Sequence, residues 1–160
     1  MRSFQVFAAM SPERATEILQ ILNDKAPGIY VQAVAAASAA MKARPKYLLK
    51  QPAEKRAQAV RRALSRVSAT AVAGEILAVY FLECRKELLT SWLDTVGLEH
   101  DEGALAEDAP KQPQKKKLDA AVDTFLGVDE DPDRELLLAA FAAQDAIEWP
   151  DLDARCAPEE

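Results

Sequence analysis

The sequence predicts an all-α fold: a bundle of five or six helices in a single domain. Apolar residues make up 49% of the 160 positions, and alanine, the strongest helix former, dominates them. The chain has only five glycines, and aromatic residues are 6% of the total. No stretch shows the alternation of β-branched or aromatic residues with polar ones that half-buried strands require.

The first two helices are indicated by their ends. Ser11 before Pro12 is typical of a helix start, because the hydroxyl can cap the first turn and proline there loses no hydrogen bond. Apolar residues then recur at helical spacing until the polar segment 23–28. A second helix is expected from about Ile29 to Arg44, where Pro45 stops it. Residues 46–50 predict a short helical turn.

Pro52 opens a third long helix with two distinct faces. Its apolar face comprises Ala57, Val60, Leu64 and Val67. The opposite face carries Lys55, Arg62 and Arg66, which we call the basic stripe. Since a row of cations on a surface helix can attract an anionic partner, these three residues are the candidate binding residues.

A fourth helix is predicted without interruption from Glu75 to Val96. Its run Ile76–Leu82 is apolar all round, which is typical of a helix at the centre of a bundle. Gly97 is expected in a left-handed conformation at its end, with Leu98 folding back on the last turn.

Glu83 is the most unusual carboxylate on that helix. At helical spacing it continues the stripe of Val72, Ile76 and Val79, so the sequence predicts a candidate buried acid. A buried carboxylate has to be protonated, paired or liganded. Pairing with an arginine of a neighbouring helix is the simplest expectation.

The sequence predicts a linker and a helical pair in the last third of the chain. The predicted ranges are a main bundle at 11–98, a linker at 99–114, a helical pair at 115–150 and a frayed tail at 151–160. Gly127 separates the paired helices, and Asp131 with Pro132 starts the second. A segment this small lacks a core of its own, so we expect the pair to dock on the main bundle, partly by charge complementarity.

Charge is sorted along the sequence. From Met1 to Leu93 the chain carries 14 Lys or Arg against 7 Asp or Glu, and from Asp94 to Glu160 it carries 6 against 19. The resulting charges of +7 and −13 give the net −6. Nine of the basic residues lie between Lys42 and Arg66, where Glu54 is the only acid. Such sorting indicates surfaces that attract each other or a partner.

No set of residues predicts catalysis, a metal or a cofactor. His100 is the single histidine, and one histidine among neighbouring acids does not supply the convergent ligands of a zinc site. The spacing of Asp129, Asp131 and Asp133 resembles the start of a calcium loop, but its sixth and twelfth positions are Arg134 and Ala140 instead of glycine and glutamate. The two cysteines are far apart and are expected to be reduced thiols.

Three hypotheses of function remain open. The favoured one is a non-enzymatic protein-interaction or structural module, with a second copy of the chain as one expected partner. The second is a nucleic-acid-associated regulator that uses the basic stripe. The third is a small-ligand binder or enzyme with a pocket between helices around Glu83, Tyr80 and Trp92. We expect a cytoplasmic protein without membrane contact, because the N-terminus lacks an export signal and the longest uncharged apolar run is far shorter than a bilayer span.

Overall fold

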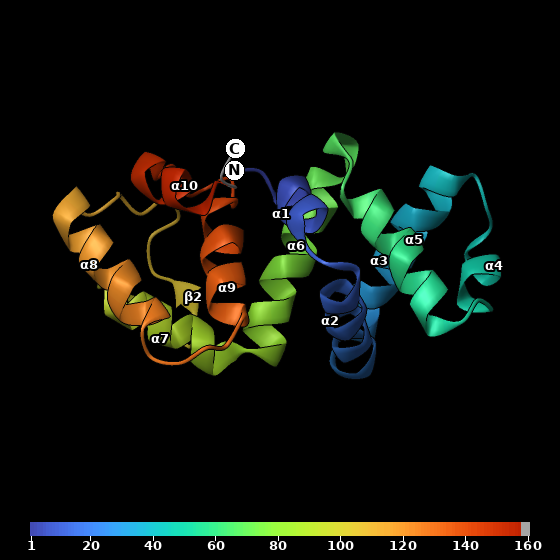
Figure 1. Cartoon of the computed structure of the whole chain (residues 1–160), viewed down its shortest axis with the longest axis horizontal. Helices are drawn as coiled ribbons and strands as arrows, with labels where there is room; N and C mark the ends of the chain where they lie inside the picture. The colour runs from blue at the N-terminus through green and yellow to red at the C-terminus, as the bar shows by residue number, and fades with distance from the viewer. Residues whose placement is uncertain (158–160) are drawn as a thin grey trace. The chain divides into compact units, whose positions relative to one another are not determined.

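A computed structural model describes residues 1–157, and these residues confirm the all-α fold class (Figure 1). The α-helices of the first half are α1 (Ser3–Ala9), α2 (Pro12–Lys25), α3 (Pro27–Met41), α4 (Pro45–Leu49), α5 (Ala53–Leu64) and α6 (Thr70–Val79). A 3₁₀ turn, η1 (Val67–Ala69), precedes α6 and a π-helical turn, η2 (Tyr80–Cys84), follows it. The remaining elements are α7 (Lys86–Val96), strands β1 (His100–Asp101) and β2 (Ala104–Leu105), α8 (Lys115–Leu126), α9 (Asp133–Ala142) and α10 (Pro150–Cys156).

By their internal contacts the residues fall into two compact units. The N-terminal unit is Arg2–Cys84, and the C-terminal unit begins at Arg85 and also includes Met1. The contacts therefore group α7 with α8, α9 and α10, whereas the sequence grouped residues 11–98 together. Each unit has its own apolar core and is described separately below.

The N-terminal unit is built around α2, α3 and α5, which pack against one another. Its core includes Ile18, Leu22 and Leu64, all fully buried. The predicted helix start at Ser11 and Pro12 is confirmed: the Ser11 hydroxyl accepts a hydrogen bond from the backbone N–H of Arg14 at 3.2 Å, with proline at the first helical position. The expected start at Ile29 is two residues late, because α3 begins at Pro27. Residues Ser3–Ala9 also form a helix, α1, which packs on α5 and α6. The sequence did not predict this helix.

The prediction of one uninterrupted helix over Glu75–Val96 is wrong. The α-helical pattern ends at Val79, widens into the π-helical turn η2, and breaks at Arg85, whose φ of −135° and ψ of 40° are not helical. The break falls at the boundary between the two units. The predicted end of α7 is confirmed, because Gly97 has φ 80° and the N–H of Leu98 donates to the carbonyl of Leu93 at 2.9 Å.

The C-terminal unit has an aromatic core. Trp92 packs against Phe125 and Phe141 with ring centroids 5.4 and 5.9 Å apart, and Phe141 packs against Trp149 at 5.2 Å. These rings come from α7, α8, α9 and the segment before α10. The helical pair thus shares a core with α7.

The predicted linker 99–114 contains no helix, but it is tied to its own unit. Strands β1 and β2 pair antiparallel, with His100 opposite Leu105. Further along, the indole N–H of Trp149 donates to the carbonyl of Pro110 at 2.8 Å. The side chain of Gln112 both donates to the Asp151 carboxylate at 2.6 Å and accepts from the Asp151 backbone N–H at 2.9 Å.

The frayed tail predicted for 151–160 is wrong for most of its length. Pro150 starts α10, two acids lie in its first turn, and Leu152 is fully buried. The helix is favoured by proline at its first position and acids in its first turn, and a buried leucine anchors it, although Trp149 supplies no side-chain cap. Residues 158–160 of the predicted tail lie outside the described residues.

One described stretch, Val67–Cys84, is long and apolar enough to cross a membrane by length and composition alone. The core helix of a soluble protein passes the same test, and one such stretch is weak evidence of a membrane span. Ile76, Leu77 and Tyr80 are buried within the fold, while the stretch as a whole is 28% buried.

Candidate functional site

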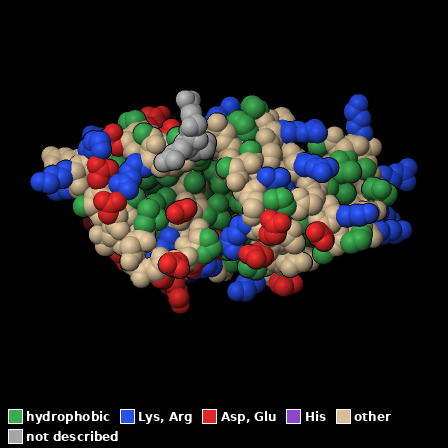
Figure 2. All heavy atoms as spheres, viewed as in Figure 1, with side chains coloured by type: hydrophobic (Ala, Val, Ile, Leu, Met, Phe, Trp, Pro, Cys, Tyr) green, Lys and Arg blue, Asp and Glu red, His purple; other side chains and the backbone are tan. Residues whose placement is uncertain are grey.

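The basic stripe lies on the surface of the N-terminal unit. Lys55, Arg62 and Arg66 are all exposed. Among residues 1–157, none of the three makes an ion pair or a side-chain hydrogen bond. Their charges are therefore available to a partner. In Figure 2, Lys and Arg side chains gather around α4 and α5.

The two other arginines of α5 have structural roles that the sequence did not distinguish. Arg56 donates to the Tyr30 hydroxyl and to the carbonyl of Leu49 at 3.1 Å, and its guanidinium lies 5.7 Å from the centre of the Tyr30 ring. Arg61 donates to the carbonyl of Met10 at 2.8 Å and so ties the end of α1 to α5. Because these bonds occupy the two guanidinium groups, Arg56 and Arg61 are not available to a partner in the way that the three residues of the basic stripe are.

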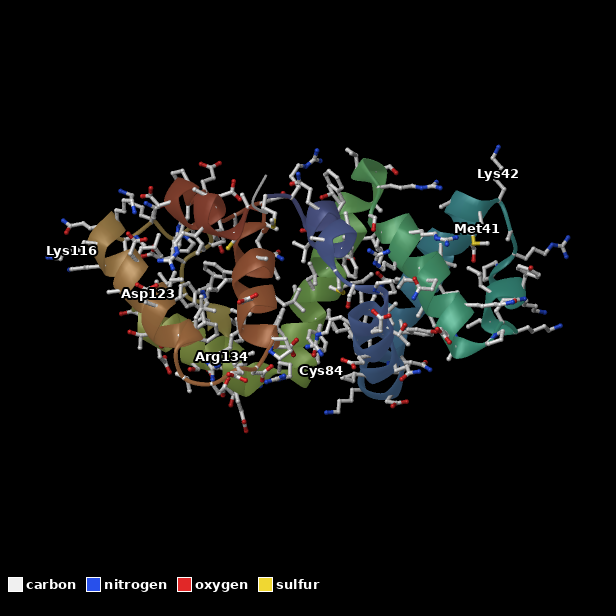
Figure 3. The ribbon with its side chains drawn as sticks, viewed as in Figure 1. Met41, Lys42, Cys84, Lys116, Asp123 and Arg134 are labelled. Carbon is white, nitrogen blue, oxygen red and sulfur yellow. The ribbon has the colours of Figure 1, made fainter. Side chains whose placement is uncertain are left out.

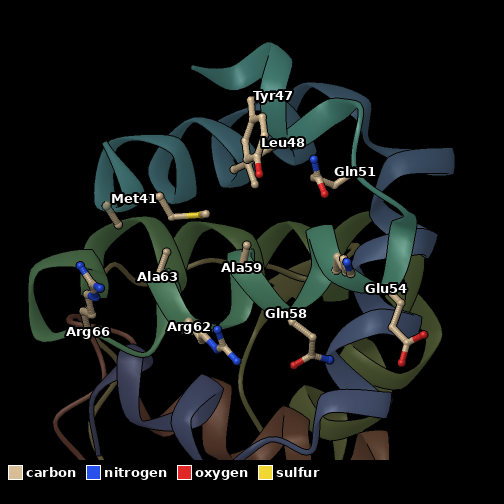
Figure 4. Close-up of a pocket in the computed structure, with 12 residues that line it drawn as sticks. Met41, Tyr47, Leu48, Gln51, Glu54, Gln58, Ala59, Arg62, Ala63 and Arg66 are labelled. Atoms are coloured by element: carbon tan, nitrogen blue, oxygen red, sulfur yellow. The ribbon is translucent and has the colours of Figure 1, made fainter. Parts of the chain in front are cut away.

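All three stripe residues border one groove between α3, α4 and α5 (Figure 4). The groove has a volume of about 770 Å³. Figure 4 shows Met41 and Tyr47 on one side of it and Ala59 and Ala63 on the other. The complete lining is Ala40, Met41, Tyr47, Leu48, Gln51, Glu54, Lys55, Gln58, Ala59, Arg62, Ala63 and Arg66.

The groove presents apolar side chains to solvent. Met41 is 48% exposed and Tyr47 is 55% exposed, although both are large and hydrophobic. Met41 and Lys42 stand at the end of α3 (Figure 3), where Lys42 adopts a left-handed conformation with φ 54° and ends the helix. Exposed apolar surface next to unpaired cations is typical of a binding surface.

The residues that line the groove are mostly apolar or cationic. It contains no histidine, cysteine, serine or threonine. Its one acid, Glu54, lies in the first turn of α5. The arrangement can hold an apolar group beside an anionic one, and it offers no nucleophile paired with a base.

His100 stabilises the β1–β2 hairpin. Its Nδ1 accepts the backbone N–H of Gly103 at 3.1 Å, and its Nε2 lies 2.7 Å from an oxygen of Asp94. Accepting at Nδ1 assigns the proton of the neutral ring to Nε2, which then donates to Asp94. A hollow of about 560 Å³ lies beside this hairpin, but both nitrogens of His100 are already engaged.

The aspartates that resemble a calcium loop are paired with arginines. Arg85 contacts the carboxylates of Asp131 at 2.6 Å and Asp133 at 2.7 Å, and Asp133 is fully buried. Arg134 (labelled in Figure 3) contacts Asp129 at 2.8 Å and donates to the carbonyl of Phe125. Within residues 1–157 no three or more His, Cys, Asp or Glu side chains are placed to hold a metal ion. The cluster is an ion-pair network that joins α7 to α9.

The prediction that Glu83 is buried is wrong, because its side chain is exposed. The cause is the π-helical turn η2, which rotates through a smaller angle per residue than an α-helix. Glu83 is therefore turned away from the helix face that buries Ile76 and Tyr80. A ligand pocket built around a buried Glu83 therefore loses its central residue.

Both cysteines are partly buried free thiols. Burial raises the pKa of Cys84, while nearby Lys25 acts in the opposite direction. Burial also raises the pKa of Cys156, to about 11. A thiol rather than a thiolate is a poor nucleophile and a poor metal ligand at neutral pH.

Comparison with protein-family models, with curated proteins and with solved structures finds no match to this chain.

Proposed function

We propose that this protein is a non-enzymatic binding module that holds a segment of a partner protein in the groove between α3, α4 and α5. One observation carries the proposal: the groove exposes Met41 and Tyr47 beside three cations that are unpaired among the described residues. Tyrosine and arginine are enriched among the residues that dominate the energetics of protein interfaces.

The size of the available interactions suits a reversible contact. Full burial of a large apolar side chain contributes about 1.5–3 kcal/mol, and Met41 and Tyr47 are each about half exposed when the groove is empty. An exposed ion pair adds about 0.2–1 kcal/mol. After the entropy cost of association, such sums correspond to affinities on the order of micromolar.

The test is a titration of the ¹⁵N-labelled full chain with three helical peptides that share one apolar face. Their polar faces are acidic, basic or uncharged. We expect at least one peptide to bind, with the largest amide shifts at Met41, Tyr47 and Ala59. The absence of binding by all three at millimolar concentration would contradict the proposal.

A matched pair of variants locates the binding surface. Met41 and Val31 both lie on α3 and are 48% and 60% exposed, but only Met41 lines the groove. We expect Met41→Ala to weaken peptide binding severalfold and Val31→Ala to leave it unchanged. Equal losses would place the contact elsewhere on α3.

Binding of a nucleic acid is the second candidate, because the stripe presents unpaired cations along α5 and just beyond its end. The apolar lining, the acid Glu54 and the net charge of −6 favour it less. Three phosphate contacts predict a slope of only about −3 in a plot of log affinity against log salt. Fluorescence anisotropy with labelled duplex and single-stranded oligonucleotides across a salt series measures this slope.

Self-association is a separate outcome. If a second copy occupies the groove, sedimentation velocity will show a concentration-dependent dimer that Met41→Ala weakens and Val31→Ala does not.

A further inference from the structure

We infer that the segment held in the groove is an amphipathic helix with an acidic edge, lying along α5. This inference rests on the proposed function and specifies the chemistry of the partner. Three features of the groove carry it: its length, the small residues at its base and the order of its charges.

The basic stripe indicates how long the partner helix is. Lys55 and Arg62 are seven positions apart on α5, so at 1.5 Å per residue they span about 10 Å. Arg66 lies two residues beyond the end of α5 at Leu64 and continues the positive edge past the helix. The span on α5 is about two turns of helix, which is enough for a partner helix to place two or three side chains on one face.

The base of the groove permits a helix to approach closely. Ala59 and Ala63 are one turn apart on α5 and both line the groove. Small side chains at this spacing leave room for the ridge of another helix. Met41 and Tyr47 form the opposite wall (Figure 4), so apolar side chains of the partner at positions i, i+3 and i+7 would pack between the two walls.

The charged residues of the groove favour a partner helix with acidic residues along one edge. Arg62 lies in the last turn of α5 and Arg66 just beyond its end, and both line the groove, so two carboxylates on the partner would face them. Lys55 extends the positive edge toward the start of α5. Glu54 lies beside it and repels an acid there. We therefore expect the acids of the partner to concentrate over Arg62 and Arg66, with an uncharged or basic residue over Glu54.

The experiment compares two 14-residue helical peptides with the same apolar face, one with glutamate and one with glutamine along the polar edge. Binding to the full chain is measured by calorimetry at low salt and again at high salt. Each exposed ion pair contributes up to about fivefold in affinity, so we expect the glutamate peptide to bind about tenfold more tightly. The advantage should shrink at high salt because the charges are exposed.

Three variants identify the charges responsible. The double change Arg62→Gln and Arg66→Gln should abolish the preference for glutamate. Lys50→Gln, which removes an exposed cation outside the groove, should preserve it. Glu54→Gln should tighten the glutamate peptide about twofold, because a repulsion is removed. Far-UV circular dichroism checks that each variant keeps its helical structure.

The outcomes separate the two claims. Equal binding of both peptides in the groove leaves the proposed function standing and overturns the acidic edge. Binding of neither peptide overturns both. Binding of duplex DNA or phosphatidylserine vesicles instead, lost in the double variant, would overturn both in favour of a phosphate ligand.

Discussion

The ion pair between Arg85 and Asp133 gives a quantitative test of the C-terminal unit. The Asp133 side chain has no exposed surface, and a guanidinium nitrogen of Arg85 lies 2.7 Å from its carboxylate. Replacing Arg85 with methionine keeps an apolar stem of similar length and removes the charge. The carboxylate then remains buried without the cation that faces it.

The expected loss follows from burial. Removing one partner of a fully buried ion pair costs about 3–5 kcal/mol. The Arg85 side chain is 32% exposed, so water can partly replace it, and we expect a loss of about 2–3 kcal/mol for Arg85→Met. With a urea dependence of about 1–1.5 kcal/mol per molar, the unfolding midpoint falls by roughly 2 M.

Tryptophan fluorescence is the appropriate assay. Trp92 and Trp149, the two tryptophans of the chain, are both buried in the C-terminal unit, so their emission reports on that unit. The matched control is Lys86→Met, because Lys86 is the next residue and pairs with Glu102 at 3.3 Å with both side chains largely exposed. That pair is worth no more than about 0.5 kcal/mol. If Arg85→Met costs no more than Lys86→Met, the reasoning about burial is refuted.

Three further predictions concern single residues. Glu83→Gln should change stability by less than about 0.5 kcal/mol in urea unfolding, because an exposed side chain is replaced; a loss of several kcal/mol would show that Glu83 is buried after all. Hydrogen bonding to Arg134 lowers the pKa of Asp129 below its usual value. Stability from this carboxylate is therefore present above pH ~4 and lost as the pH falls further, and Asp129→Asn should flatten the acid part of a fluorescence-monitored stability profile. Cys156, with its pKa raised to about 11, should react slowly with iodoacetamide at pH 7.5 and faster in urea, as mass spectrometry would show.

The sequence predicted those elements whose causes are local. Alanine-rich composition indicated helices, and Pro12 and Gly97 marked ends that the structure confirms. The predicted stop at Pro45 is wrong, because Lys42 in a left-handed conformation already ends α3 at Met41 and Pro45 begins α4. The α10 helix was missed although Pro150 and the acids after it give part of the signal of Pro12 and Glu13. The hydroxyl cap that Ser11 supplies has no counterpart at Trp149.

Other features depend on contacts between distant residues. The break at Arg85 has no glycine or proline to mark it. There Arg85 pairs with Asp131 and Asp133, forty-six and forty-eight positions away. Sequence spacing also could not show that Arg56 and Arg61 bond to backbone carbonyls while Arg62 and Arg66 do not. The stripe residues were identified from the sequence, but the groove beside them was not, because Met41 and Tyr47 come from other helices.

The division among the arginines of α5 has a consequence for which substitutions the chain can accept. Arg56 and Arg61 direct several N–H groups at fixed carbonyl and hydroxyl oxygens, and a lysine ammonium cannot reproduce that geometry. At positions 62 and 66 no oxygen of the described chain sets the orientation, so lysine would keep the positive edge of the groove. These four arginines, three on α5 and one just beyond its end at Leu64, are thus under two different rules: two positions require the guanidinium group, and two require only a cation.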